Sequence, residues 1–265
     1  MKLKYFVAAL ALATFMTSCE DDTPSQNPNT TTSEVPVILH YDFKYGTTDF
    51  ALNQEFTSDS GYTIRYTLAT FYLAKPVIMD DAGNSTALNP EYYIIRPDVM
   101  MSNMGTIEAG HAHMFNVSIG VDAETNTETG GNGMQPTDFS DVNHPLAPQP
   151  EGMYWSWASG YIFVKIEGEI DYEGDGTYDQ TFKYHLGTDP FRKDRSTMLH
   201  TSVEKGDTLD ITMTVDYQQF LQGIDLHSEV LTMSMGDARP LAEKMMNQFD
   251  AATSFELGSD HGHKK

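Results

Sequence analysis

Histidines are the side chains of this sequence best suited to binding a transition metal. Seven of them lie between residues 35 and 257: His40, His111, His113, His144, His185, His200 and His227. Imidazole is the commonest protein ligand for copper and zinc. His111 and His113 are two residues apart, so on a strand they would share a face and could chelate one ion. His113 also alternates in phase with Phe115 and Val117, so the alternative is a histidine satisfied at the end of a core strand.

The two tryptophans of the sequence stand close together. Trp155 and Trp157 lie in the segment GMYWSWASGYIF, residues 152–163. On a strand the two indoles would project from the same face. They could be core anchors, because aromatic side chains bury the most area, or a platform on which a bound molecule stacks.

An acidic segment between two predicted strands carries regularly spaced oxygen donors. Its positions 1, 3, 5, 7 and 9 are Asp171, Glu173, Asp175, Thr177 and Asp179, and position 6 is Gly176. This spacing resembles the first part of an EF-hand calcium loop. Position 12 is Phe182 rather than a bidentate glutamate, and strands flank the segment. A loop stabilised by calcium and an acidic hairpin tip without an ion both fit this pattern, and either role would be structural.

The composition limits both partners and chemistry. The sequence has 16 basic and 38 acidic residues, a formal net charge of -22. Such a charge disfavours nucleic acid and anionic membrane surfaces as partners. The sequence contains no Walker loop, dinucleotide fingerprint, G-x-S-x-G elbow or HExxH helix. We therefore expect a protein that is not an enzyme and does not bind nucleic acid.

The first residues predict secretion and a lipid anchor. Lys2 and Lys4 precede an apolar run over residues 5–16, which is typical of a signal peptide and too short to cross a bilayer. The only cysteine, Cys19, follows the residues MTS, at the place of the lipid-acceptor cysteine of bacterial lipoproteins. Residues 1–18 are therefore predicted to be the signal peptide.

The residues after Cys19 predict a tether. Residues 19–34 are rich in Thr, Ser, Asn and Pro and have no apolar period, so we expect a flexible link between lipid and domain. The acidic cluster directly after Cys19 resembles a signal for export to the outer face in some bacterial groups. The sequence thus predicts an outer-membrane lipoprotein, periplasmic or at the cell surface, that meets the membrane only through its lipid.

The elements that would position these side chains are mainly strands. Alternating or β-branched and aromatic residues predict strands over 37–45, 62–73, 114–121, 161–170, 181–186 and 208–215. Residues 238–250 have a helical period, with Asp237 as a candidate N-cap, and 217–221 predicts a shorter helical turn. We predict an all-β fold over residues 35–257, an antiparallel β-sandwich with one or two short helices near the C-terminus, followed by a polar, histidine-containing tail over 258–265.

The sequence resembles the MbnP-like family of methanobactin-associated periplasmic copper proteins in four segments: TLATFYLAKPVIMDDAG, VSIGVDAETN, GMYWSWASGYIFVKIEG and FKYHLG. Proteins of this family are typically paired with a di-haem cytochrome c peroxidase-like protein that oxidises a tryptophan to kynurenine. The resemblance implies a copper site with His185 of the YHLG segment and a product of Trp155 or Trp157, of which Trp157 is preferred. It also implies His40, because relatives often carry a histidine there.

Two further histidines are copper candidates. His144 precedes Pro145 in a loop shortly before the tryptophans, and His113 belongs to the His-x-His pair. Two classes of function follow. One is a lipid-anchored extracytoplasmic copper-binding protein; the other is a cell-surface β-sandwich module, not catalytic, that binds glycan or protein through the tryptophans and is braced by calcium.

Overall fold

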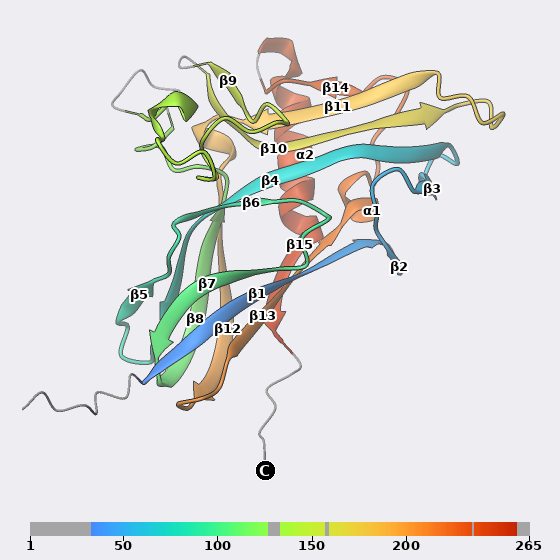
Figure 1. Ribbon diagram of the computed structural model, residues 1–265. Helices are drawn as coiled ribbons and strands as arrows, with labels where there is room; N and C mark the ends of the chain where they lie inside the picture. Colours follow the sequence, from blue (N-terminus) through green and yellow to red (C-terminus); the bar gives the residue numbers. More distant parts are fainter. Residues whose placement is uncertain (1–32, 127–132, 157–158, 235, 259–265) are drawn as a thin grey trace, which may run out of the picture. The chain divides into compact units, whose positions relative to one another are not determined.

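Two β-sheets make up most of the computed structural model, which describes residues 33–126, 133–156, 159–234 and 236–258 (Figure 1). The first sheet has the strand order β15-β13-β1-β2, and β7 also pairs with β1. Its strands are β1 (Glu34–Tyr45), β2 (Thr48–Asp49), β7 (Met101–Glu108), β13 (Leu209–Asp216) and β15 (Thr253–Leu257).

The second sheet is larger and has the order β12-β8-β4-β10-β11-β14. Its main strands are β4 (Thr63–Met79), β8 (Gly110–Ile119), β10 (Gly160–Asp171), β11 (Gln180–Gly187), β12 (Lys193–Val203) and β14 (Leu231–Thr232). Four short strands join it: β3 (Glu55–Thr57), β5 (Ser85–Ala87) and β6 (Tyr92–Ile95) pair with β4, and β9 (Tyr154–Ser156) pairs with β10.

Two α-helices are found among the described residues, α1 (Tyr217–Phe220) and α2 (Arg239–Ala252), together with three short 3-10 helices: η1 (Pro136–Asp138), η2 (Asp189–Phe191) and η3 (Gly236–Ala238). Asp216 caps α1 by accepting hydrogen bonds from the backbone of Gln218 and Gln219. The predicted cap of α2 is wrong by one residue, because Ala238 is the N-cap and Asp237 lies in η3.

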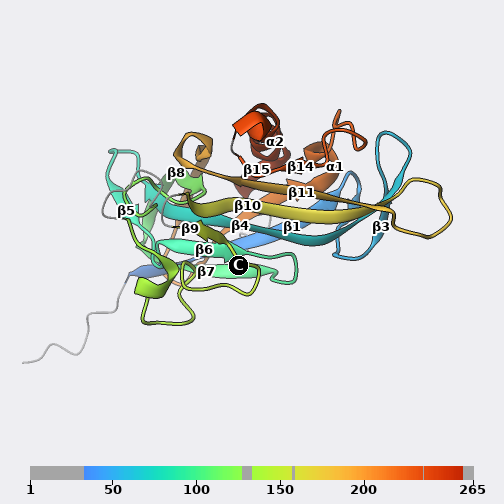
Figure 2. The ribbon, with the colours of Figure 1, turned by 90° about the horizontal axis from the view of Figure 1, so that it is seen from above.

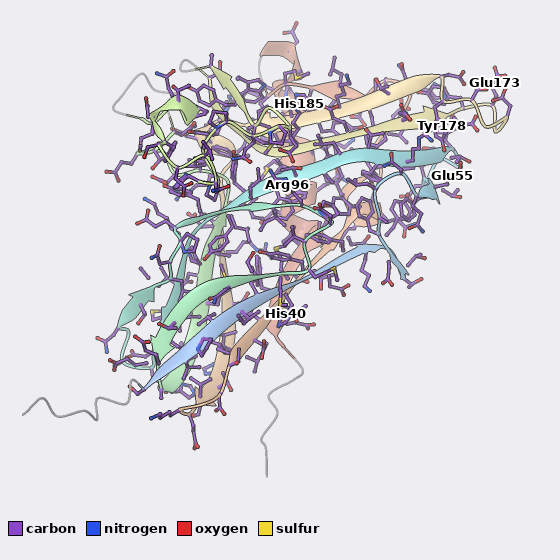
Figure 3. All side chains as sticks on the ribbon, viewed as in Figure 1. His40, Glu55, Arg96, Glu173, Tyr178 and His185 are labelled. Carbon is purple, nitrogen blue, oxygen red and sulfur yellow. The ribbon has the colours of Figure 1, made fainter. Side chains whose placement is uncertain are left out.

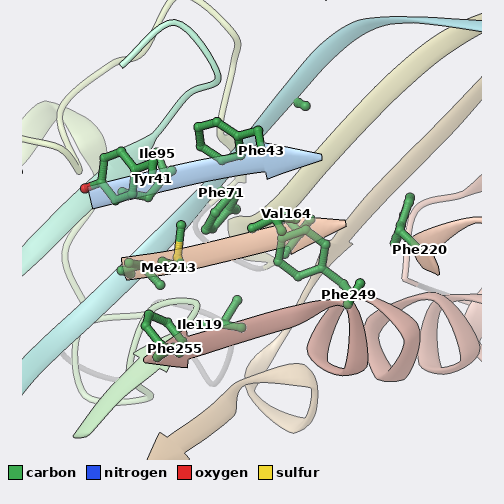
Figure 4. Close-up of a cluster of buried hydrophobic side chains, with 14 of the residues drawn as sticks. Tyr41, Phe43, Phe71, Ile95, Ile119, Val164, Met213, Phe220, Phe249 and Phe255 are labelled. Atoms are coloured by element: carbon green, nitrogen blue, oxygen red, sulfur yellow. The ribbon is translucent and has the colours of Figure 1, made fainter. Parts of the chain in front are cut away.

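Alternation along β1 determines which of its side chains enter the core. Val37, Leu39 and Tyr41 are buried, whereas the residues between them are partly or fully exposed, as expected for a strand with one covered face. Figure 4 shows the core between the sheets, where α2 places Phe249 beside Phe71 of β4 with ring centroids 5.0 Å apart. Viewed from above, α1 and α2 lie along one side of the sheets (Figure 2).

A second, smaller hydrophobic cluster lies on the other face of the larger sheet. It contains Tyr72, Ala74, Tyr92, Val121, Leu146, Met153, Tyr161 and Phe163. The segment between η1 and β9 covers this face, and Tyr161 donates to the carbonyl of Leu146 over 3.2 Å. The strand β10 is therefore buried on both faces at its beginning, where the tryptophan segment joins it.

The predicted β-sandwich with short helices near the C-terminus is confirmed. Its sheets are mixed rather than purely antiparallel, because β1 pairs with β13 and β11 pairs with β14 in parallel. Both parallel pairs join strands that are distant in the sequence. The alternation within a strand reports which face is covered and not the direction of its partner, so this feature could not be predicted.

Candidate metal centres

His185 lies on the outer face of the larger sheet. Its neighbours Tyr184 and Leu186 on β11 point into the core, so His185 points to the opposite face. The side chain is 11% exposed, and its Nε2 is 2.6 Å from Oε1 of Glu167 on the adjacent strand β10. Burial lowers the pKa of His185, and the hydrogen bond to Glu167 offsets this only in part. The ring is therefore neutral at pH 7 and has a lone pair for a metal.

Trp155 lies directly beside this histidine's strand. A Cβ on Gly187 would be 2.8 Å from Cζ3 and 3.0 Å from Cη2 of the Trp155 indole. Gly187 and His185 are two residues apart on β11 and share a face. The half-buried Trp155 thus meets the YHLG segment at Gly187, two residues along β11 from His185. Trp157 lies outside the described residues.

Several contacts hold the tryptophan segment on the sheet. Glu151 forms a bidentate ion pair with Arg96, with Nε to Oε1 at 2.5 Å and Nη2 to Oε2 at 3.0 Å. Lys165 donates to the carbonyl of Glu151 over 2.5 Å. Asn126 accepts from the backbone of Tyr161 at 2.9 Å and donates to Asp189 at 2.7 Å. Through these bonds, residues that are distant in the sequence hold both ends of the tryptophan segment on the sheet.

His40 lies on the smaller sheet and is not brought together with His185. Its Nε2 is 2.7 Å from Oδ1 of Asp210, which belongs to β13. The neighbouring Leu39 and Tyr41 point into the core, so His40 points away from the larger sheet. Figure 3 shows His40 and His185 on different parts of the fold.

His144 has a structural setting in its loop. Its Nδ1 accepts from the backbone of Leu146 over 3.1 Å, and its ring stacks on Phe139 with centroids 4.1 Å apart. Burial lowers the pKa of His144. A ring that accepts at Nδ1 carries its proton on Nε2, so neither nitrogen offers a free lone pair in this arrangement.

His113 lies in a cluster with His111, His200 and Asp81. Nδ1 of His111 and Nδ1 of His113 are each 2.8 Å from a different carboxylate oxygen of Asp81. The His113 and His200 rings are 4.4 Å apart, almost perpendicular. Among the described residues, only Asp81, His111 and His200 of this cluster form a group of three histidine or carboxylate ligands whose atoms lie within 4.8 Å of one another.

The acidic segment after β10 forms a turn held by hydrogen bonds. The buried Asp171 accepts from the backbone of Gly174 at 2.7 Å and of Gly176 at 2.8 Å, and Asp175 accepts from Thr177 at 2.7 Å. Glu173 and Asp179 are exposed. Within the described residues these carboxylates do not converge as a group of three. Calcium binding here stays a prediction.

The sequence analysis missed two residues of these centres, Glu167 and Asp81, and it named His200 only as one of seven histidines. Glu167 lies in an ordinary alternating strand, and its approach to His185 depends on the pairing of β10 with β11. Asp81 lies well beyond residue 73, the predicted end of its strand, because β4 continues to Met79. No local pattern indicates Asp81 or His200.

The fold and the donors define a β-sandwich protein whose candidate metal ligands are imidazoles and carboxylates. The only cysteine of the sequence, Cys19, lies outside the described residues. The model of the MbnP family matches residues 34–236, and the chain belongs to that family. The resemblance seen in the sequence is thereby confirmed.

The solved structure of MbnP from Methylosinus trichosporium has the same fold. It superposes with a TM-score of 0.54 at 14% sequence identity, over 79% of this chain and 87% of that one. No curated protein matches the sequence. Family membership supports a copper-related protein associated with methanobactin in general, and relates it to a partner protein. No helix among the described residues is long and apolar enough to cross a membrane.

Proposed function

We propose that this protein is a lipid-anchored, extracytoplasmic copper-binding protein without catalytic activity. In this proposal, His185 and a kynurenine made from Trp155 or Trp157 hold the copper, and a di-haem cytochrome c peroxidase-like partner makes the kynurenine. The observation that carries it is the contact of the Trp155 indole with Gly187, two residues from His185 on the same face of β11. Membership of the MbnP family supports the choice of metal.

The donor set at His185 fits a copper ion. When Nε2 donates to Glu167, the lone pair of the neutral ring is on Nδ1. A carboxylate that orients a ligating histidine in this way is the usual outer partner of a metal-bound imidazole. An intact indole only donates through its N-H, whereas ring opening to kynurenine supplies a ketone and an aryl amine with lone pairs. Glu167 would keep the imidazole in place and increase its basicity.

The proposal is tested in two steps. Peptide mass spectrometry of protein from its native cells should find one of the two tryptophans converted to kynurenine, and recombinant protein made without the partner should contain both unmodified. Copper titration of the native protein should then show at least tenfold weaker binding for His185→Ala. His40→Ala is the matched control, because His40 also pairs with a carboxylate but lies on the other sheet.

Unchanged copper affinity in His185→Ala, with two intact tryptophans in native protein, would refute this proposal. The binding-module hypothesis would then come first, and one observation favours it: a hollow of about 230 Å³ beside the tryptophan segment is lined by Tyr72, Met153, Tyr154 and Tyr161. Tyr154 is the partly exposed aromatic ring of this hollow and could stack on a sugar ring, whereas Tyr72 and Tyr161 beneath it are buried. In that function calcium at Asp171 would brace the hairpin.

A further inference from the structure

We propose that Asp81, His111, His113 and His200 form a second metal site, which binds a divalent first-row transition-metal ion such as Zn²⁺ or Cu²⁺. The cluster is far from His185. Lys165 of β10 pairs with His185 on one side and with Thr70, in the middle of β4, on the other. Asp81 lies beyond the C-terminal end of β4. At about 3.3 Å per residue, the two places are on the order of 30 Å apart along that strand.

Strand pairing places Asp81 between two histidines. Met79 of β4 pairs with Met114 of β8, so the next residues of β4 run toward Ala112, which His111 and His113 flank. The turn that carries Asp81 is fixed by its neighbour: Oδ1 of Asp80 accepts from the backbone of Ala82 at 2.9 Å and of Asn84 at 2.8 Å. The carboxylate of Asp81 is thus presented from a fixed turn.

A bulge brings in the third imidazole. The register of β12 against β8 shifts between Met198 and Thr201, and His200 lies within this shift with a φ of 45°. Positive φ is uncommon in residues other than glycine, and bulges redirect side chains. Here the irregular backbone places the His200 ring 4.4 Å from that of His113 and 6.2 Å from that of His111.

One nitrogen of the cluster has no hydrogen-bond partner. Nδ1 of His111 is buried and makes no hydrogen bond, although Oδ2 of Asp81 is only 2.8 Å away. The two atoms are close but misaligned for a hydrogen bond. A buried nitrogen without a hydrogen-bond partner costs folding stability. An ion bound between His111 and Asp81 would use the lone pairs of both and remove this cost.

The types of ligand atom indicate which metal ion the site binds. Three imidazoles and one carboxylate suit Zn²⁺ or Cu²⁺, whereas Ca²⁺ and Mg²⁺ prefer sites made of oxygen alone. The ligand atoms of Asp81, His111 and His200 already lie within 4.8 Å of one another. Ligands of a tetrahedral zinc ion with bonds of about 2.0–2.1 Å are roughly 3.3 Å apart, so small side-chain rotations complete the site. A hollow of about 280 Å³ borders His111 and gives access from solvent.

The experiment is a calorimetric titration with Zn²⁺. The recombinant protein is made without a histidine tag and without the partner. Both tryptophans are intact in this protein, so the kynurenine ligand of the proposed function is absent. One site of micromolar or tighter affinity is expected, together with a rise in melting temperature. His113→Ala and His200→Ala should each weaken binding at least tenfold, and Co²⁺ should give the visible spectrum of a tetrahedral ion only in the parent protein.

Controls separate this site from the others. His40→Ala and His185→Ala should leave zinc affinity unchanged, and a variant with both tail histidines, His261 and His263, replaced by alanine should bind as the parent does. If a histidine variant fails to fold, Asp81→Asn still tests the site, because Asp81 lies in an exposed turn. Zinc affinity unchanged in His113→Ala, His200→Ala and Asp81→Asn, or lost only with the tail histidines, would overturn the proposal.

Discussion

At the scale of single residues, Gly187 determines how closely Trp155 approaches His185. An added Cβ would be 2.8 Å from the indole and 2.6 Å from the backbone carbonyl of Tyr161. The carbonyl belongs to the paired strand β10 and cannot move aside. We therefore expect Gly187→Ala to lower the free energy of unfolding by about 1–3 kcal/mol, the usual cost of overpacking, and to change tryptophan fluorescence.

Urea denaturation of the two proteins measures this effect. Gly110→Ala is the control, because no atom lies within 4 Å of a Cβ built there. It should change the free energy of unfolding by no more than about 0.5 kcal/mol. Equal stabilities of Gly187→Ala and Gly110→Ala would show that the contact between Trp155 and β11 is looser than described.

The residues of the candidate centres differ in how far the sequence could predict them. His111 and His113 were recognised as a pair, because two residues that are two positions apart on a strand lie on the same face. The in-phase alternation with Phe115 indicated a half-buried His113 at the end of the core, and 27% of its side chain is exposed. The bulge of β12 opposite this part of β8 brings His200 next to His113. A bulge in a partner strand leaves no mark in the alternation of the strand beside it.

At the scale of elements, the ion pair of Arg96 and Glu151 joins the end of β6 to the start of the tryptophan segment. The hydrogen bond from Arg96 holds the pKa of Glu151 below its usual range, against burial, which raises it. A lowered pKa in the folded state stabilises the protein above the unfolded value of about 4.3, and this stabilisation is lost as the pH falls through the folded pKa.

Glu151→Gln should therefore cost about 1–2 kcal/mol of unfolding free energy at pH 7. The difference from the parent should shrink as the pH falls below the unfolded value of about 4.3 and through the lower pKa of the folded carboxylate. Denaturation at pH 7, 5, 4 and 3 would measure it. Asp49→Asn is the control, because Asp49 pairs with Lys44 at a surface position that is 91% exposed, where solvent screens the pair. A constant difference between parent and Glu151→Gln at every pH would contradict this role of the carboxylate.

The strands that the sequence predicted are those whose two faces differ. The segments 37–45, 62–73 and 161–170 correspond to β1, β4 and β10, in which buried and more exposed residues alternate along β1 and along the parts of β4 and β10 that are covered on one face. The strand β12 was not predicted: its residues are polar, and only Leu199 and Val203 are buried. An edge strand of this kind is fixed by its hydrogen bonds to β8, which composition does not reveal.

At the scale of the whole molecule, the net charge of -22 explains why the protein would need the proposed lipid anchor to stay at a membrane. An acidic domain is repelled by anionic lipid headgroups, so its own surface gives no reason to stay at a membrane. The residues between Cys19 and β1, 20–33, lie almost entirely outside the described part, and their composition predicts a flexible chain. A flexible tether of this length would have an end-to-end distance of roughly 20 Å and would let a lipid anchor hold the domain near the bilayer without contact.

Because the domain is acidic, attachment through a lipid can be distinguished in cells from attachment through a charged surface. The parent protein should fractionate with membranes, remain there in high salt, which disrupts electrostatic attachment, and be released by detergent. Cys19→Ala removes the lipid-acceptor thiol and should leave the protein in the soluble fraction or in an unprocessed form of higher mass. Release of the parent by salt alone would instead indicate attachment through a charged surface. Membrane retention of a processed Cys19→Ala protein would contradict the lipid anchor, and with it the location assigned to the copper site.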